Sequence, residues 1–261
     1  MDKFSDFFPG KWVKRILPIA FVLGLLANFP ASIIWDYAQS RIQLPRQLSV
    51  EGVSGSLWQG ETLISIRDQG RKLQLKGEWK LGLPALLESG ELFVLVVNHP
   101  GTELKLIASP GWNFASISGQ LSGHLHPLLL NPFLKQNKAW ISGDTSINAL
   151  AFRVQNGRPE SLTGSAIWQG GETYFLPPGG KSPRLIRYPQ LAIKALTGSD
   201  GAIDTQVTAL GTQEPLIKAS LMKDGWLSVA VFGRIKQAVP DLPVPRKPLD
   251  QTLVKYKEKV F

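Results

Sequence analysis

The stretch Leu73-Gln74-Leu75-Lys76-Gly77-Glu78-Trp79-Lys80-Leu81 decides the fold. Its side chains alternate in character along the chain. The three leucines and Trp79 fall on one face, whereas the glutamine, the glutamate and the lysines between them fall on the other. A period of two predicts an antiparallel strand with one face on a core and the other face in solvent.

The same alternation recurs on the C-terminal side of this stretch. It appears in Glu103 to Ile107, Ala115 to Leu125, Ile141 to Val154, Ile203 to Leu210 and Leu227 to Val231. Residues that favour turns punctuate these runs, at 68–70, 88–90, 98–101, 155–157, 199–201 and 223–225. The pattern predicts a mainly β domain of about a dozen strands joined by hairpins.

Other segments of this region break the alternation. Prolines at the start of Pro84 to Leu87 and of Pro127 to Leu134 favour two short helical turns. Residues 177–189 are rich in proline and glycine, which predicts a loop. Residues 240–261 are expected to form a proline-rich linker and a basic tail, and the end of that tail forms either a short amphipathic helix or a disordered segment.

Two short strings within the β region resemble each other. Gly55-Ser56-Leu57-Trp58-Gln59-Gly60 recurs, with one inserted residue, as Gly164-Ser165-Ala166-Ile167-Trp168-Gln169-Gly170. The echo favours a domain of two related β halves, although chance recurrence in a strand-rich chain is the alternative. Trp58, Trp79 and Trp168 all stand near glycines, which let a ring or a strand approach closely, so we expect these indoles to stabilise a thin β core.

The N-terminal region differs from the rest of the chain. Residues 16–34 contain no charged side chain, and 19 residues of helix span about 28 Å, close to the hydrocarbon thickness of a bilayer. Trp12 precedes the run, and Trp35 and Tyr37 follow it, as expected for rings at the two membrane interfaces. The run predicts a transmembrane anchor over residues 16–35.

The flanking charges predict the orientation of this anchor. Four lysines and arginines precede it and only Arg41 and Arg46 follow closely, so residues 1–15 are expected in the cytoplasm and a β domain over 36–239 in the periplasm. A cleaved signal peptide is the alternative. It is disfavoured because cuts after Ala31 or Ala38 lack the small residue needed two positions earlier. A buried core helix is disfavoured because no comparable helix follows.

The composition narrows the class of protein further. The net charge is +9, but the positive residues are spread along the chain with modest excesses at both ends, which is not the stripe typical of a nucleic-acid binder. Terminal basic runs beside a membrane favour contact with anionic lipid. There is no cysteine, and therefore neither a disulfide framework nor a thiolate metal site.

The sequence contains no pattern that predicts catalysis. His124 and His126 share the polar face of a predicted strand, but they lack a third metal ligand, so solvent-facing histidines are expected. Gly180-Lys181-Ser182 resembles the end of a phosphate loop, but Phe175 stands where the first glycine belongs. We therefore expect no enzyme activity and no cofactor.

The layout and three short strings resemble the type II secretion system protein N family. The Gly55–Gly60 string is similar to the family's Gly-Thr-Val-Trp-Ser/Gln-Gly element, with Ser56 and Leu57 in place of threonine and valine. Leu75–Leu81 resembles its Leu-x-Gly-x-Trp-x-Leu strand, and Leu121-Ser122-Gly123 its Leu-Ser-Gly element. The motif residues carried over are Gly55, Trp58, Gly60, Gly77, Trp79, Gly123 and, from the internal echo, Trp168.

The resemblance implies an accessory inner-membrane component of a bacterial type II secretion system. Its periplasmic domain would act as a scaffold that binds other inner-membrane and periplasmic components while folded proteins cross the outer membrane. A membrane-tethered β domain that handles lipids or lipoproteins has the same layout and is the alternative function. A periplasmic enzyme is the third and least favoured possibility.

Overall fold

The structure is a computed structural model. It describes residues 10–39, 44, 46–68, 71–82, 93–111, 115–135, 138–175, 183–245 and 247–261. The expected helical turn at 84–87 and the Gly180–Ser182 string lie outside the described residues.

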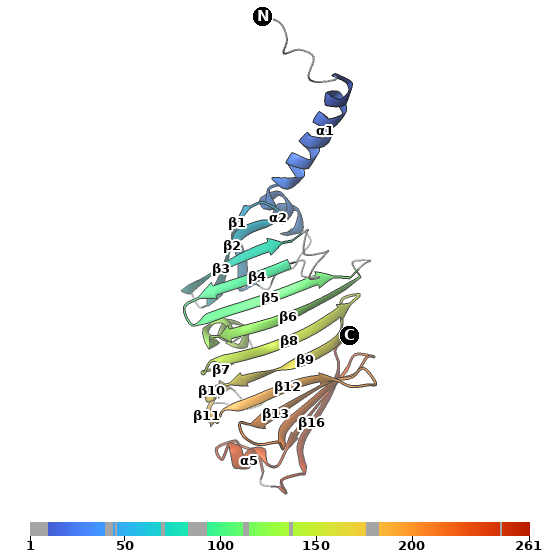
Figure 1. The fold of residues 1–261 in the computed structure, drawn as a ribbon. Coiled ribbons are helices and arrows are strands. Elements are labelled where there is room, and N and C mark those ends of the chain that lie inside the picture. The colour runs from blue at the N-terminus through green and yellow to red at the C-terminus, as the bar shows by residue number, and fades with distance from the viewer. Residues whose placement is uncertain are drawn as a thin grey trace, which may run out of the picture.

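One large antiparallel sheet forms most of the molecule (Figure 1). It has 13 strands in the order β1-β2-β3-β4-β5-β6-β8-β9-β12-β13-β14-β15-β16, so nearly every strand pairs with its neighbours in the chain. Its strands are β1 Leu48–Gly55, β2 Gln59–Asp68, β3 Arg71–Leu81, β4 Phe93–His99, β5 Thr102–Pro110, β6 Ser116–Leu125, β8 Thr145–Gln155, β9 Arg158–Trp168, β12 Leu191–Thr197, β13 Ile203–Ala209, β14 Pro215–Leu221, β15 Trp226–Phe232 and β16 Thr252–Lys259. The predicted mainly β, antiparallel class is confirmed.

One face of this sheet is apolar over a long distance. The pairing sets Leu125 opposite Thr145, Thr145 opposite Trp168, and Trp168 opposite Leu191, so these residues of four successive strands share a face. The opposite face is polar on β3, where Lys76 and Glu78 are exposed and form an ion pair of 3.1 Å. The alternation predicted for residues 73–81 is therefore confirmed.

Three small elements cover parts of the apolar face. The first is a turn of helix that comprises η1 Pro127–Leu129 and α4 Asn131–Leu134, as predicted for residues 127–134. The second is a separate sheet in the order β11-β10-β7, with β7 Ala139–Ile141, β10 Gly171–Phe175 and β11 Arg184–Tyr188. The third is α5 Ile235–Ala238.

The loop predicted over residues 177–189 is wrong for residues 184–188, and residues 177–182 lie outside the described part of the chain. β11 Arg184–Tyr188 pairs with β10 along five residues, and its Ile186 is 1 % exposed. The prolines around this segment suggested a loop, but they flank the strand and leave its N–H groups free to pair.

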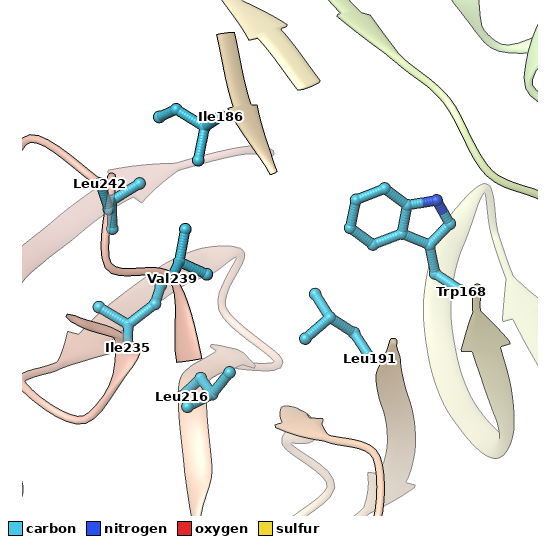
Figure 2. Close-up of a cluster of buried hydrophobic side chains, with 7 residues drawn as sticks. All are labelled: Trp168, Ile186, Leu191, Leu216, Ile235, Val239 and Leu242. Atoms are coloured by element: carbon cyan, nitrogen blue, oxygen red, sulfur yellow. The ribbon is translucent and has the colours of Figure 1, made fainter. Parts of the chain in front are cut away.

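Two clusters of buried side chains lie between the sheet and its covering elements. The smaller cluster joins Ile66 and Leu75 of the sheet to Leu129 of η1, with Leu125 packed against it. The larger one, which we call the C-terminal cluster, contains Trp168, Ile186, Leu191, Leu216, Ile235, Val239 and Leu242. Figure 2 shows Val239 between Ile235 and Ile186, with the Trp168 ring beside Leu191.

The C-terminal segment belongs to the sheet domain. The sequence predicts a linker and tail over residues 240–261, whereas Leu242 is buried in the C-terminal cluster and β16 pairs with β15 from Thr252 to Lys259. Both alternatives predicted for the end of the tail, a short amphipathic helix and a disordered segment, are therefore wrong. The Arg158 guanidinium at the start of β9 lies 5.4 Å from the centre of the Phe261 ring, although four strands separate β9 from β16, so this end of the sheet is strongly curled.

Two helices precede the sheet. α1 Gly10–Ala27 projects away from it, and α2 Ala31–Gln39 lies against its first strands (Figure 1). The uncharged run expected to form one span is thus divided between two helices, with the break at residues 28–30. Among the described residues, no helix combines the length and the apolar character needed to cross a membrane.

Candidate functional site

The helices meet the sheet at the hairpin between β1 and β2. Pro30, between α1 and α2, forms a bridge with Ser56, and the Leu57 N–H donates to the Phe29 carbonyl oxygen at 2.8 Å. The Leu81 N–H at the end of β3 donates to the Trp58 carbonyl oxygen at 2.6 Å. This place, which we call the junction, joins the helical segment to the first three strands through backbone hydrogen bonds.

The Gly55–Gly60 string forms the hairpin turn of the junction. Gly55 has φ of 99°, a conformation that a side chain disfavours, and it faces Gly60 across the pair of strands. The Ser56 N–H donates to the Gln59 carbonyl oxygen at 2.9 Å, and the Ser56 hydroxyl accepts from the Gln59 N–H at 3.3 Å. The serine that departs from the family pattern therefore closes the turn.

Trp79 packs directly on this turn. A Cβ placed on Gly60 would lie 2.4 Å from Cζ2 of Trp79 and 2.2 Å from the Ser54 carbonyl oxygen, so the ring occupies the space that a side chain would fill. Gly77 plays a similar part on β3, where a Cβ would lie 2.8 Å from Cγ2 of Thr62. The expectation that glycines near the tryptophans allow close approach is confirmed at Trp79.

An apolar cavity of about 360 Å³ lies between α2 and the apolar face of the sheet at the junction. We call it the junction cavity. Its lining residues come from α2, the first four strands and the turn: Ala31, Ile34, Trp35, Val50, Val53, Leu57, Thr62, Ile64, Trp79, Leu81 and Leu95. None of them carries a charge, and the threonine hydroxyl is the only polar side-chain group apart from the two indole N–H groups.

The face of the sheet opposite the junction cavity is charged. Glu51 forms an ion pair with Lys72 at 2.7 Å and accepts hydrogen bonds from the hydroxyl of Ser65 and the amide of Gln74. The hydrogen bond from Lys72, followed by that from Ser65, holds the pKa of Glu51 below its ordinary value. The junction thus separates a charged surface from an uncharged cavity across the thickness of one sheet.

The motif residues divide into two groups in space. Gly55, Trp58, Gly60, Gly77 and Trp79 come together at the junction. Gly123 and Trp168 lie elsewhere. Gly123 has φ of 128° at an irregularity in β6, where a Cβ would lie 2.0 Å from the Glu103 carbonyl oxygen.

Trp168 ends β9 and lies in the C-terminal cluster. Its indole N–H donates to the carbonyl oxygens of Ser142 and Gly143, at 2.9 and 3.2 Å, and its ring lies 5.8 Å from that of Tyr188. The first string of the echo forms a hairpin turn, whereas the second comprises the last five residues of β9 and the two residues after it, so they do not occupy equivalent positions. The division of the β domain into two related halves therefore stays a prediction, and the positions of the two strings do not support it.

The three histidines lie near the turn between β4 and β5 and the neighbouring end of β6. His99 and His124 border an open cavity of about 670 Å³ with Glu103 and Asp144. His124 is exposed, as expected, and bonds the Ser146 hydroxyl at 3.0 Å, whereas His126 follows the strand and accepts from the Leu128 N–H at 3.2 Å. Among the described residues, no group of three or more histidines and carboxylates is placed to hold a metal ion.

Sequence reasoning missed the helical wall of the junction cavity. Ala31, Ile34 and Trp35 recur at the i, i+3, i+4 spacing of one helix face. That signal was present in the sequence, but it lies inside the uncharged run that was interpreted as one membrane span.

Comparison of the chain with protein-family models, with curated proteins and with solved structures gives no match.

Proposed function

We propose that this protein is an accessory inner-membrane component of a type II secretion system, with the sheet as a periplasmic binding surface. Its membrane anchor is the part of the run 16–35 that lies in α1, because α2 packs on the sheet. The observation that carries the proposal is the junction. The two strings that resemble the family lie on different strands, yet they pack together as one unit, with Trp79 against Gly60. A shared motif is expected to form such a unit.

The exposed helix α1 supports the membrane anchor. Its large apolar side chains between Ile16 and Leu25 are 52 to 68 % exposed, and nothing in the described part of the chain covers them. Exposed apolar area of that extent favours contact with lipid or with another protein. The basic residues before Ile16 favour a cytoplasmic N-terminus.

The charged face of the sheet supports the binding role. It presents polar side chains next to one another, such as the network of Glu61, Lys76 and Glu78, with no covering element among the described residues. Partners in a secretion machine would meet this face or the free edge of β16. We propose no catalytic activity for the protein.

Deletion of the gene followed by an assay of protein export tests the main proposal. We expect substrates of the secretion system to accumulate in the periplasm, and the full chain supplied in trans to restore export. A chain carrying Gly60→Ala should restore it less well than a chain carrying Gly52→Ala. Normal export in the deletion strain would contradict the proposal.

The absence of cysteine makes the orientation directly measurable. Single cysteines placed at Ser5 and at Ser220 provide one reporter on each side of the proposed anchor. We expect a membrane-impermeant maleimide to label the second site, but not the first, in cells with a permeabilised outer membrane. Labelling of both sites before the inner membrane is disrupted would contradict the proposed anchor.

A lipid- or lipoprotein-handling role is the second candidate. The long apolar face that runs from β3 to β12 on one side of a single sheet favours it, because an acyl chain would need such a surface. Lipid extraction from the purified full chain, taken together with the export assay, separates the candidates. Stoichiometric acyl lipid together with normal export in the deletion strain would favour this role over the first.

A further inference from the structure

The junction cavity has no assigned occupant. Its three walls are α2, the β1–β2 hairpin and the apolar face of β2 to β4, and Ile64 belongs both to its lining and to the edge of the small buried cluster. It is therefore a hollow continuous with the core. Tight packing is the rule in protein interiors, so a cavity of about 360 Å³ at this place needs a physical reason.

The lining restricts the chemistry of an occupant to hydrocarbon. A charged or strongly polar ligand would lose its hydration here without gaining partners, because the cavity offers only the Thr62 hydroxyl and two indole N–H groups. Aliphatic side chains from α2, β1, β2 and β3, with the rings of Trp35 and Trp79, present an apolar surface instead. Such a surface gains free energy by excluding water.

The size and the position of the cavity indicate which kind of hydrocarbon group it would bind. The volume is at the small end of the range for ligand pockets, about 300–1,000 Å³, and this suits a single chain better than a whole diacyl lipid. The cavity wall formed by Ala31, Ile34 and Trp35 begins four residues after the end of α1, the helix with exposed apolar side chains. Ile34 lines the cavity and is still 39 % exposed, so the opening lies beside the helical segment.

We infer that the junction cavity binds one acyl chain of a membrane phospholipid. The inference rests on the membrane anchor of the proposed function, and it holds for both candidate roles. Binding would seat the first strands of the sheet against the bilayer surface. It would also complete a core that the described residues leave hollow.

Photolabelling of the full chain tests this inference. The chain is reconstituted into vesicles of phosphatidylethanolamine and phosphatidylglycerol that contain a phospholipid with a diazirine near the methyl end of one acyl chain. After irradiation, mass spectrometry locates the labelled peptides. We expect label on α1 and also on peptides that contain the lining residues Trp35, Val53 and Trp79.

A pair of variants ties the label to the cavity. Val53→Phe fills the hollow, whereas Val96→Phe makes the same change on the opposite face, where Val96 pairs with Glu78 on β3. We expect Val53→Phe to reduce cavity labelling about tenfold and to leave α1 labelling unchanged, and Val96→Phe to change neither. Far-ultraviolet circular dichroism checks the fold of each variant.

A second pair of variants avoids the sheet altogether. Ala31→Leu fills the cavity from α2, and Ser32→Leu adds the same side chain at the exposed neighbouring position. If Val53→Phe fails to fold, this second pair tests the inference instead. We then expect about tenfold less cavity labelling in Ala31→Leu than in Ser32→Leu. Equal labelling of the cavity in Ala31→Leu and Ser32→Leu would overturn the inference.

The label on α1 distinguishes the inference from the proposed anchor. Label on α1 without label in the cavity would overturn the inference and leave the anchor standing. Label on neither would overturn both. If the cavity peptides are unlabelled and the protein migrates as a dimer, a second copy of the chain is the occupant. That result would also overturn the inference of a bound acyl chain.

Discussion

Trp79 and Trp168 lie on the same face of one sheet, yet their surroundings differ. Trp168 is 9 % exposed, and its ring is enclosed by β11, β12 and the segment that follows α5. Trp79 is half-buried and borders the junction cavity, and in the part of the chain that the structure describes the turn and α2 are what covers it. Among the described residues, the C-terminal end of the sheet therefore has a core completed by its own chain, whereas the N-terminal end has an open core.

The difference follows from what covers each end. The large sheet cannot bury its apolar face by itself, so each part of that face needs a second layer. The C-terminal cluster receives the three-stranded sheet and the residues from Ile235 to Leu242. Of the described elements, the junction receives the nine residues of α2 alone, because α1 projects away. Open and closed cores in one sheet are expected to respond differently to substitution.

Truncation of the two tryptophans tests this comparison most strongly. Trp168→Ala should lower the free energy of unfolding by about 3–5 kcal/mol, because the cluster around it is closed and leaves a cavity. Trp79→Ala should cost about 1–2 kcal/mol, because its ring already borders a hollow and part of it is exposed. Urea unfolding of each variant, followed by far-ultraviolet circular dichroism, measures the difference. Equal losses would contradict the distinction between the two ends.

Gly60→Ala is expected to have the next largest effect. The new methyl group meets the Ser54 carbonyl oxygen and the Trp79 ring, so backbone or ring must move, at a cost of about 1–3 kcal/mol. Gly52→Ala on the neighbouring strand is the matched control, because a Cβ there has nothing within 4 Å. It should be neutral or stabilise by up to about 1 kcal/mol. Thermal unfolding of the two variants under the same conditions measures the difference in stability between them.

Much of the sheet could be predicted because its signal is local. The alternation in Leu73 to Leu81 requires only a strand with one buried face, and Pro127 at the start of a helical turn requires only its own φ angle. β16 was missed for a different reason. Lys255, Lys257 and Lys259 stand at every second position, which is a strand signal, but the prolines before them favoured a linker and a tail. The pairing with β15 shows that this segment is a strand.

The site was predictable in its parts but not in its assembly. Glycines near Trp79 predicted a close approach, and the structure shows which glycine accepts the ring. The role of Ala31, Ile34 and Trp35 could not be predicted, because the same apolar stripe serves a helix in lipid and a helix on a sheet. Only the three-dimensional position of the β1–β2 hairpin distinguishes the two cases.

Gly77→Ala is expected to lower the free energy of unfolding by less than Gly60→Ala does, and it tests a single side-chain contact of the junction. The added methyl group lies 2.8 Å from Cγ2 of Thr62, a side-chain atom that can be removed without changing the backbone. We expect a loss of about 1 kcal/mol in the natural background. In a Thr62→Ser background, which lacks that methyl group, the loss should largely disappear. A double-mutant cycle by urea unfolding gives the coupling, and additive effects would show that the contact is not the cause.

The smallest expected effect concerns the charged face opposite the cavity. Because Lys72 and Ser65 hold the pKa of Glu51 below its ordinary value of 4.5, the ionised carboxylate favours the folded state. That contribution is present above pH 4.5 and is lost as the pH falls through the lower pKa of the folded protein. Glu51→Gln should therefore destabilise the protein at pH 7, and the difference from the natural chain should vanish in acid.

The partner of Glu51 provides the control for this pH dependence. In a Lys72→Met background the first cause of the shift is gone, so Glu51→Gln should cost less at pH 7 than it does in the natural chain. Salt should reduce the effect as well, because the Lys72 side chain is 46 % exposed. A Glu51→Gln effect that is unchanged in the Lys72→Met background, yet still vanishes in acid, would assign the stabilisation to the hydrogen bond between the carboxylate and Ser65. In that case the junction would be held together by backbone contacts and apolar packing, and the charges on its outer face would remain available to a partner.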